Sequence, residues 1–207
     1  MRCKSALLAV LVLVVAACGT AGSNMAESDS SIPASSTTTS STTTFVTTTM
    51  SPEARGLLPQ TKALPLASGD VFDNNVNQLW SAIRSGNSQL GDQFFFPLTA
   101  YVQVKAISDP VHDYDTRLMK AYHTDLLSYH AQLNALGGTP ELIGLEVPQS
   151  QAAWILPGEE YNKGSYWRVY GSELVFSEDG VRHYFPVYSL ISWRGEWYVV
   201  HLGPPTQ

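Results

Sequence analysis

The sequence predicts an α+β domain with N-terminal helices packed on an antiparallel β-sheet, preceded by a signal peptide and a disordered tether. Between positions 70 and 136, apolar residues recur at spacings of three and four, whereas positions 142–202 form short apolar runs separated by Gly, Pro and Asn. Of the 22 aromatic residues, only Phe45 precedes Phe72. Helices followed by strands are typical of an α+β domain, and residues 53–207 are long enough for a single core.

Residues 1–17 have the features of a signal peptide. A basic start is followed by an unbroken apolar run over positions 6–15, shorter than the roughly 20 residues that a membrane-spanning helix needs. The run ends in Val15-Ala16-Ala17-Cys18-Gly19, which resembles a bacterial lipobox. This resemblance implies lipid attachment at the Cys18 sulfur and cleavage before it. An ordinary cleaved signal with an incidental cysteine, or an uncleaved anchor, is the alternative.

We therefore expect a lipoprotein anchored in the cell membrane, with its folded domain on the extracytoplasmic face. Two or three acyl chains are enough for stable anchoring. Residues 18–52 are expected to be the lipidated cysteine and a disordered linker, because a Ser/Thr-rich segment buries too little apolar surface to offset its ordering entropy. The clustered threonines of this linker either accept O-glycans or form an unmodified spacer.

Charge and cysteine content exclude several functions. The formal net charge is −6, and loss of Arg2 and Lys4 with the signal peptide makes it −8. No Lys/Arg cluster exceeds two residues, so we expect no binding of nucleic acid and no adhesion of the folded domain to anionic lipid. Residues 53–207 contain no cysteine, which excludes a cysteine nucleophile and thiolate metal ligands in the domain.

Helices are expected in the first half of the domain. Residues 70–85 form one, with Asp73 as its N-cap and Gly86 as its end. A buried aromatic run at positions 94–96, ended by Pro97, precedes a second short helix over Leu98–Ile107.

The strongest helical pattern follows Asp109-Pro110, a favourable N-cap and first-turn pair. Tyr and Leu residues recur at steps of three or four from position 114 to position 136, and Gly137-Gly138 ends the pattern. Asp113 and Arg117 are expected to form an ion pair on its exposed side.

Strands are expected after Pro140, where the segments become rich in Trp, Tyr, Val and Ile. The last two are joined by Arg194-Gly195, a plausible hairpin turn. The predicted strands are Leu142–Val147, Ala152–Leu156, Ser165–Tyr170, Glu173–Phe176, His183–Trp193 and Glu196–Leu202.

The terminal hairpin, Leu190-Ile191-Ser192-Trp193-Arg194-Gly195-Glu196-Trp197-Tyr198-Val199-Val200-His201-Leu202, follows helices and antiparallel strands in an order that resembles the NTF2-like (SnoaL-like) cone fold. The resemblance covers roughly residues 70–203 and implies a curved sheet around a pocket. The segment from 137 to 170 departs from the family's pattern, which puts the strand order in doubt. The whole chain also looks similar to uncharacterised actinobacterial lipoproteins, a resemblance that implies no activity.

No motif for a nucleophile elbow, a zinc protease, a phosphate-binding loop or a dinucleotide site occurs, and we expect neither a cofactor nor a metal. His112 and Asp113 are adjacent at a helix start, where neighbouring side chains diverge, which favours a solvated helix end over a metal site. His123 and His130 share a helix face with Asp125 nearby. They form either a general base with its carboxylate or partly exposed surface positions.

The NTF2-like resemblance also implies a pocket that contains a histidine or an acid together with a tyrosine. Aromatic side chains on the strands either line such a pocket or fill the core between sheet and helices, and core is favoured for most of them. The candidate ligand-pocket residues are Tyr101, Trp154, Tyr166, Trp167, His183, Tyr188 and His201.

The sequence thus favours a non-catalytic binding or interaction module in the cell envelope. Its expected partner is an envelope protein, a wall component or a small apolar ligand. The alternative is an NTF2-like acid/base enzyme that acts on a small apolar molecule in the cone pocket. No residue matches a catalytic motif of that family, so no catalytic residue is assigned.

Overall fold

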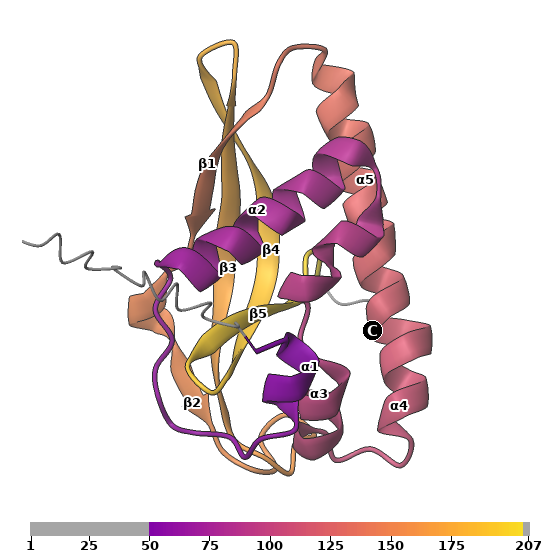
Figure 1. Cartoon of the computed structure of the whole chain (residues 1–207), viewed down its shortest axis with the longest axis vertical. Helices are drawn as coiled ribbons and strands as arrows, with labels where there is room; N and C mark the ends of the chain where they lie inside the picture. The colour runs from indigo at the N-terminus through magenta and orange to yellow at the C-terminus, as the bar shows by residue number, and fades with distance from the viewer. Residues whose placement is uncertain (1–49, 205–207) are drawn as a thin grey trace, which may run out of the picture. The chain divides into compact units, whose positions relative to one another are not determined.

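The computed structural model of the chain describes residues 50–204. The predicted signal peptide, Cys18 and the linker as far as residue 49 lie outside the described residues. Residues 50–204 form an α+β fold in which helices pack against an open antiparallel sheet (Figure 1), which confirms the predicted fold class at this level. Within this described part, no helix is both long and apolar enough to cross a membrane.

Helix α2 (Asp70–Ser85) has the bounds that the sequence predicts and ends at the left-handed Gly86. Its N-cap is Gly69 rather than Asp73, so that prediction is wrong. The Asp73 amide already donates to the Gly69 carbonyl at 2.9 Å, which places Asp73 inside the first helical turn. The short helices before and after it are α1 (Pro52–Gly56) and the 3₁₀ segment η1 (Ser88–Phe94).

Helix α3 spans Leu98–Val104 and ends three residues before the predicted Ile107. The helix ends early because the Ala106 amide donates to the Tyr161 carbonyl, at 2.8 Å, and not to a carbonyl of the preceding helical turn. An isolated bridge also joins Lys105 to Asn162. The end of α3 is therefore fixed by a loop distant in sequence, which local spacing does not reveal.

The next helical run starts as predicted, since the Asp109 carboxylate accepts a 3.0 Å hydrogen bond from the His112 amide. It consists of α4 (Pro110–Asp113), the π-helical segment η2 (Tyr114–Met119) and α5 (Lys120–Leu136). Gly137, with φ of 88°, ends the run in the left-handed region, as the sequence indicates. The π-helical turn was not predicted.

The sheet has the order β1-β3-β4-β5, and β2 pairs with β3 beyond the end of β1. The predicted strands Ser165–Tyr170 and Glu173–Phe176 are one continuous strand, β3. Gly171, which suggested a break, has φ of 72° within a register that runs on to Glu178. The strands are β1 (Glu141–Glu146), β2 (Ala153–Ile155), β3 (Tyr166–Glu178), β4 (Val181–Trp193) and β5 (Glu196–His201), with the 3₁₀ turn η3 (Gln149–Gln151) between β1 and β2. The predicted Arg194-Gly195 turn joins β4 to β5, with positive φ at both residues.

Aromatic stacking joins the helices to the sheet. Trp80 of α2 lies 5.2 Å from the ring of Phe176, and Tyr129 of α5 stacks on Phe185 at 4.5 Å. Both helices therefore cover the same face of β3 and β4 (Figure 1). Burying each such side chain contributes about 1.5–3 kcal/mol, so this layer stabilises the packing of the helices on the sheet.

Residues 51–67, which precede α2, form hydrogen bonds to α3 and to the terminal hairpin. The Glu53 carboxylate accepts hydrogen bonds from the Leu98 and Thr99 amides at 3.0 and 3.1 Å, and so caps α3 from outside. The indole of Trp193 donates to the Arg55 carbonyl at 3.1 Å. The first residues of the described chain thereby fix the helix that carries Tyr101.

Candidate functional site

A partly open cavity of about 160 Å³ lies between α3, the loop that precedes β3, and strands β3 to β5. Four of the seven sequence-predicted pocket residues line it, namely Tyr101, Tyr166, Tyr188 and His201. The other lining residues are Lys105, Glu160, Arg168, Tyr170, Ser189, Ile191 and Val200.

Strand β3 forms one wall of the cavity with every second side chain. Tyr166, Arg168 and Tyr170 lie two residues apart, so their side chains leave the same face of the strand. Arg168 lies opposite Ile191 in the register of β3 and β4. The ring of Tyr170 lies 5.3 Å from that of Tyr188, and both are partly exposed, so the two tyrosines border the opening.

The Glu160 carboxylate interacts with two neighbours. One carboxylate oxygen forms an ion pair with the Arg168 guanidinium, and Oε2 accepts a 2.8 Å hydrogen bond from the Tyr166 hydroxyl. The guanidinium also lies 4.2 Å from the centre of the Tyr170 ring, at a distance typical of a cation–π contact. Its Nε is buried and has no partner among the described residues.

Asn162 shapes the loop that carries Glu160. Its side chain is 2% exposed; Oδ1 accepts from the Glu160 amide, and Nδ2 donates to the Leu156 and Gly164 carbonyls. The loop is fastened to the end of α3 by the Lys163 amide, which donates to the Val104 carbonyl at 2.7 Å. This arrangement brings Glu160 next to Lys105, the residue that follows α3.

Lys105 lines the cavity and forms no ion pair with a carboxylate of the described residues. Its Nζ donates only to the backbone carbonyl of Glu160, at 3.3 Å, and among residues 50–204 no acidic side chain lies within ion-pair distance of it. Burial lowers the pKa of Lys105, and the nearby Arg117 lowers it further, against an opposing effect of Asp113. The cavity therefore disfavours the ammonium that it contains.

Tyr101 connects the cavity to the partly exposed ion pair of Asp113 and Arg117, which the sequence predicts. Its hydroxyl donates a 2.5 Å hydrogen bond to Asp113 Oδ2, and Arg117 holds both oxygens of that carboxylate at 2.6 Å. The pKa of Asp113 is lowered, first by the hydrogen bonds from Arg117, so it stays ionised. Arg117 belongs to the π-helical segment η2, a distortion that often occurs at functional sites.

His201, on β5, is a neutral group at neutral pH. Burial lowers its pKa to about 4, and the positive charges of Arg117 and Lys105 act in the same direction. Burial raises the pKa values of Tyr101 and Tyr166, which keeps both hydroxyls protonated. The cavity thus combines a neutral imidazole with hydroxyl donors and two cationic side chains.

Three predicted pocket residues lie elsewhere. Trp167 alternates with Tyr166 and Arg168, so it leaves the other face of β3, where its ring packs against Trp154 at 5.4 Å. Its indole donates to the Lys62 carbonyl at 3.1 Å. These two tryptophans therefore contact the segment 51–67 and do not line this cavity.

His183 is separated from the cavity along β4. It stacks on Phe176 at 5.4 Å and precedes the cavity residue Ser189 by six positions, or about 20 Å of strand. The helix histidines are also apart from the cavity. His123 pairs with Asp92 at 2.6 Å, and His130 Nδ1 donates to the Ile83 carbonyl at 2.7 Å.

Asp125 accepts a 3.1 Å hydrogen bond from the Gly203 amide and pairs with neither helix histidine. The described residues contain no group of three His, Cys, Asp or Glu side chains placed to hold a metal ion.

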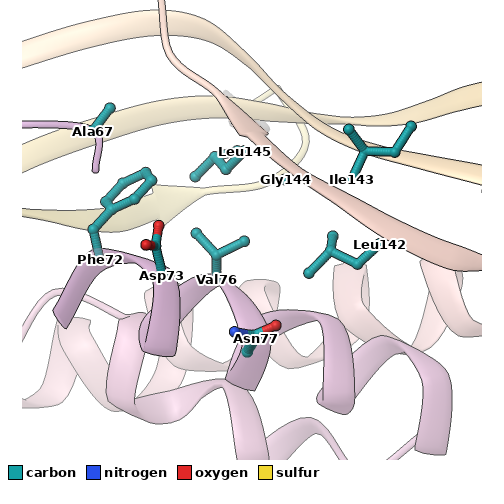
Figure 2. A pocket seen from close by; sticks show the side chains of 9 residues that line it. All are labelled: Ala67, Phe72, Asp73, Val76, Asn77, Leu142, Ile143, Gly144 and Leu145. Carbon is teal, nitrogen blue, oxygen red and sulfur yellow. The ribbon is translucent and has the colours of Figure 1, made fainter. Parts of the chain in front are cut away.

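A second cavity, of about 250 Å³, lies between α2 and the edge strand β1 (Figure 2). Apolar residues line most of it, with Phe72 and Val76 on the helix and Leu142 and Leu145 on the strand. Asp73 is the one charged side chain that lines it, beside the amide of Asn77. Because the cavity between α3 and β3 to β5 brings three charged side chains together and this one has a single charged residue, we take the former, the charged cavity, as the candidate functional site.

Comparisons with protein-family models, with curated proteins and with solved structures found no match to this chain.

Proposed function

We propose that this chain is a lipid-anchored envelope protein whose folded domain binds a small anion in the charged cavity. The observation that carries the proposal is Lys105, a half-buried ammonium without a carboxylate partner in the described structure. A buried charge is costly unless it is paired. An anionic ligand would supply the missing partner.

The other charges strengthen this argument. Glu160 is already occupied by Arg168 and Tyr166, so it does not neutralise Lys105. Arg168 is a second cationic side chain that lines the cavity. An anion placed between Lys105 and Arg168 would interact with both, and charge-assisted hydrogen bonds are roughly twice as strong as neutral ones.

The size of the cavity limits the ligand. A volume of about 160 Å³ is well below the roughly 300–1,000 Å³ of a pocket for a drug-sized ligand. The tyrosine rings provide apolar contact, and the cationic groups provide the charge. A short carboxylic acid therefore fits this site better than the small apolar ligand that the sequence analysis favours.

The anchor is part of the same proposal and rests on the lipobox-like residues that end at Cys18. The Ser/Thr-rich linker would hold the domain away from the membrane on the extracytoplasmic face. Cys18→Ala should abolish incorporation of labelled palmitate and release the protein from the membrane fraction. Unchanged labelling of this variant would refute the lipid anchor.

The open antiparallel sheet, the helices on one face and the cavity beside the terminal hairpin support the resemblance to the NTF2-like cone. In that fold the pocket also serves enzymes, which makes an acid/base enzyme the second candidate. The hydrogen bond from Tyr101 to Asp113, within a network that includes Arg117, favours this candidate, because it fixes a hydroxyl at the cavity wall. An envelope protein or wall component as a partner is the outcome expected if no small ligand binds.

Mass spectrometry of the full chain, purified from its own cells in mild detergent, tests ligand binding. The native spectrum of the wild type should contain an added mass of metabolite size that disappears on denaturation. The added mass should be absent from Lys105→Met and present in Lys120→Met, since Lys120 is exposed on α5. An equal added mass in both variants would refute binding at Lys105.

A further inference from the structure

We infer that the Lys105 amine forms an imine with the carbonyl group of a short 2-oxo carboxylate bound in the charged cavity. This inference rests on the proposed function and adds a substrate class and a covalent step to it. Three properties of the site support it: the placement of Lys105, the guanidinium of Arg168 in the lining of the same cavity, and the walls that surround them.

Lys105 differs from the other lysines of the described segment. Lys62, Lys120 and Lys163 are exposed, whereas Lys105 is half-buried and lines the cavity. Its single hydrogen bond, to the Glu160 carbonyl at 3.3 Å, is long. The amine is therefore free to turn toward a ligand without breaking an ion pair.

The protonation state of Lys105 suits a nucleophile. Only the neutral amine carries the lone pair that attacks a carbonyl carbon, and desolvation beside another cation is a known way to raise its fraction. Here burial and the nearby Arg117 both lower the lysine pKa.

Arg168 supplies the second half of the recognition. Its guanidinium lines the same cavity as Lys105, and a ligand carboxylate is a natural partner for a guanidinium. A ligand that contacts both side chains in this small cavity needs a carboxylate for Arg168 and a carbonyl for Lys105 on a short chain. A 2-oxo acid of three or four carbons has this arrangement and fits about 160 Å³.

The reaction balances without any further reactant. The Nζ lone pair forms a bond to the carbonyl carbon, giving a carbinolamine after one proton moves from nitrogen to oxygen. The second amine proton and the hydroxyl group then leave as water, and a carbon–nitrogen double bond replaces the carbon–oxygen double bond. The tyrosine rings that border the cavity limit its contact with bulk water.

Reductive trapping tests the inference on the full chain in mild detergent. The protein is incubated with pyruvate and cyanoborohydride, which reduces an imine to a stable secondary amine, and the lysines are mapped by peptide mass spectrometry. We expect one reduced pyruvate adduct, on Lys105. Lys105→Arg should lose the adduct, and the matched control Lys120→Arg should keep it.

Acetate separates this inference from the proposed function, since it has the carboxylate but no ketone. Acetate should protect Lys105 from trapping, in proportion to its concentration. Binding of both acids without an adduct on Lys105, or equal labelling of all the lysines, would overturn the imine and leave anion binding intact. Absence of binding by either acid would overturn both.

Discussion

Glu160 Oε2 accepts a 2.8 Å hydrogen bond from the hydroxyl of Tyr166, while the other oxygen of the same carboxylate pairs with Arg168. Lys105 has no acidic partner among the described residues, although its Nζ contacts the Glu160 backbone carbonyl. The cavity therefore contains one acid, Glu160, whose carboxylate interacts with Tyr166 and Arg168 and not with Lys105. The resulting excess of positive charge is the basis of the predictions below.

Lys105→Met should leave the fold intact and keep or raise its stability. The ammonium is half-buried and its lowered pKa shows that the folded state disfavours the charge. Replacement by an apolar chain of similar length should change the free energy of unfolding by between zero and about 1 kcal/mol in the stabilising direction. Urea unfolding at pH 7 measures this. A loss of several kcal/mol would show that Lys105 is structural.

His201 should make stability depend on pH. Its pKa is about 4 in the folded state against 6.5 for a free histidine, so the unfolded chain binds the proton more tightly. The free energy of unfolding should therefore fall by up to about 3 kcal/mol as pH drops from 6.5 to about 4. His201→Asn should remove this part of the pH dependence.

The control for that experiment is His112→Asn, at an exposed position at the start of the long helical run. Carboxylates also titrate in this range, so the quantity to compare is the difference between each variant and the wild type at each pH. That difference should change with pH for His201→Asn and stay constant for His112→Asn. Equal behaviour of the two variants would contradict the burial of His201.

Asn162→Ala should destabilise the loop that carries Glu160. The 2%-exposed side chain bonds to one backbone amide and two backbone carbonyls, and truncation leaves these groups unsatisfied. We expect a loss of about 2–4 kcal/mol in the free energy of unfolding, with weaker anion binding. Asn74→Ala, at an exposed position of α2, should be close to neutral. Equal melting temperatures of the two variants would refute the role of Asn162.

Glu53→Ala should weaken the N-terminus of α3. The Glu53 carboxylate accepts from the Leu98 and Thr99 amides and replaces the missing side-chain cap of this helix. Loss of such a cap typically costs about 1 kcal/mol. Hydrogen exchange at the amides of α3 should accelerate. Glu141→Ala, which removes an exposed acid on β1, should leave that exchange unchanged.

Much of the fold follows from local sequence. The bounds of α2, the Asp109 N-cap and the Arg194-Gly195 turn are set by residues next to one another, so the sequence predicts them correctly. The early end of α3 depends on a hydrogen bond from Ala106 to Tyr161, which is distant in sequence. Spacing along the chain does not contain that information.

The site is less predictable for the same reason. Lys105 follows Tyr101 by four residues in a predicted helix, and Arg168 follows Tyr166 by two in a predicted strand. Each therefore shares a face with a predicted pocket residue, and this spacing is enough to predict both as pocket residues. Glu160 lies in an irregular loop with no such pattern. Trp167 was assigned to the pocket by residue type, although strand alternation places it on the opposite face from Tyr166.

Calorimetric titration of the full chain in mild detergent with pyruvate, and with its neutral methyl ester as the control ligand, tests the central claim most directly. The account predicts that wild type and Lys120→Met bind pyruvate and discriminate against the ester. Lys105→Met should bind pyruvate at least tenfold more weakly, a loss of about 1.4 kcal/mol. Equal affinity of wild type and Lys105→Met for pyruvate, or equal affinity of the wild type for acid and ester, would contradict an anion site at Lys105.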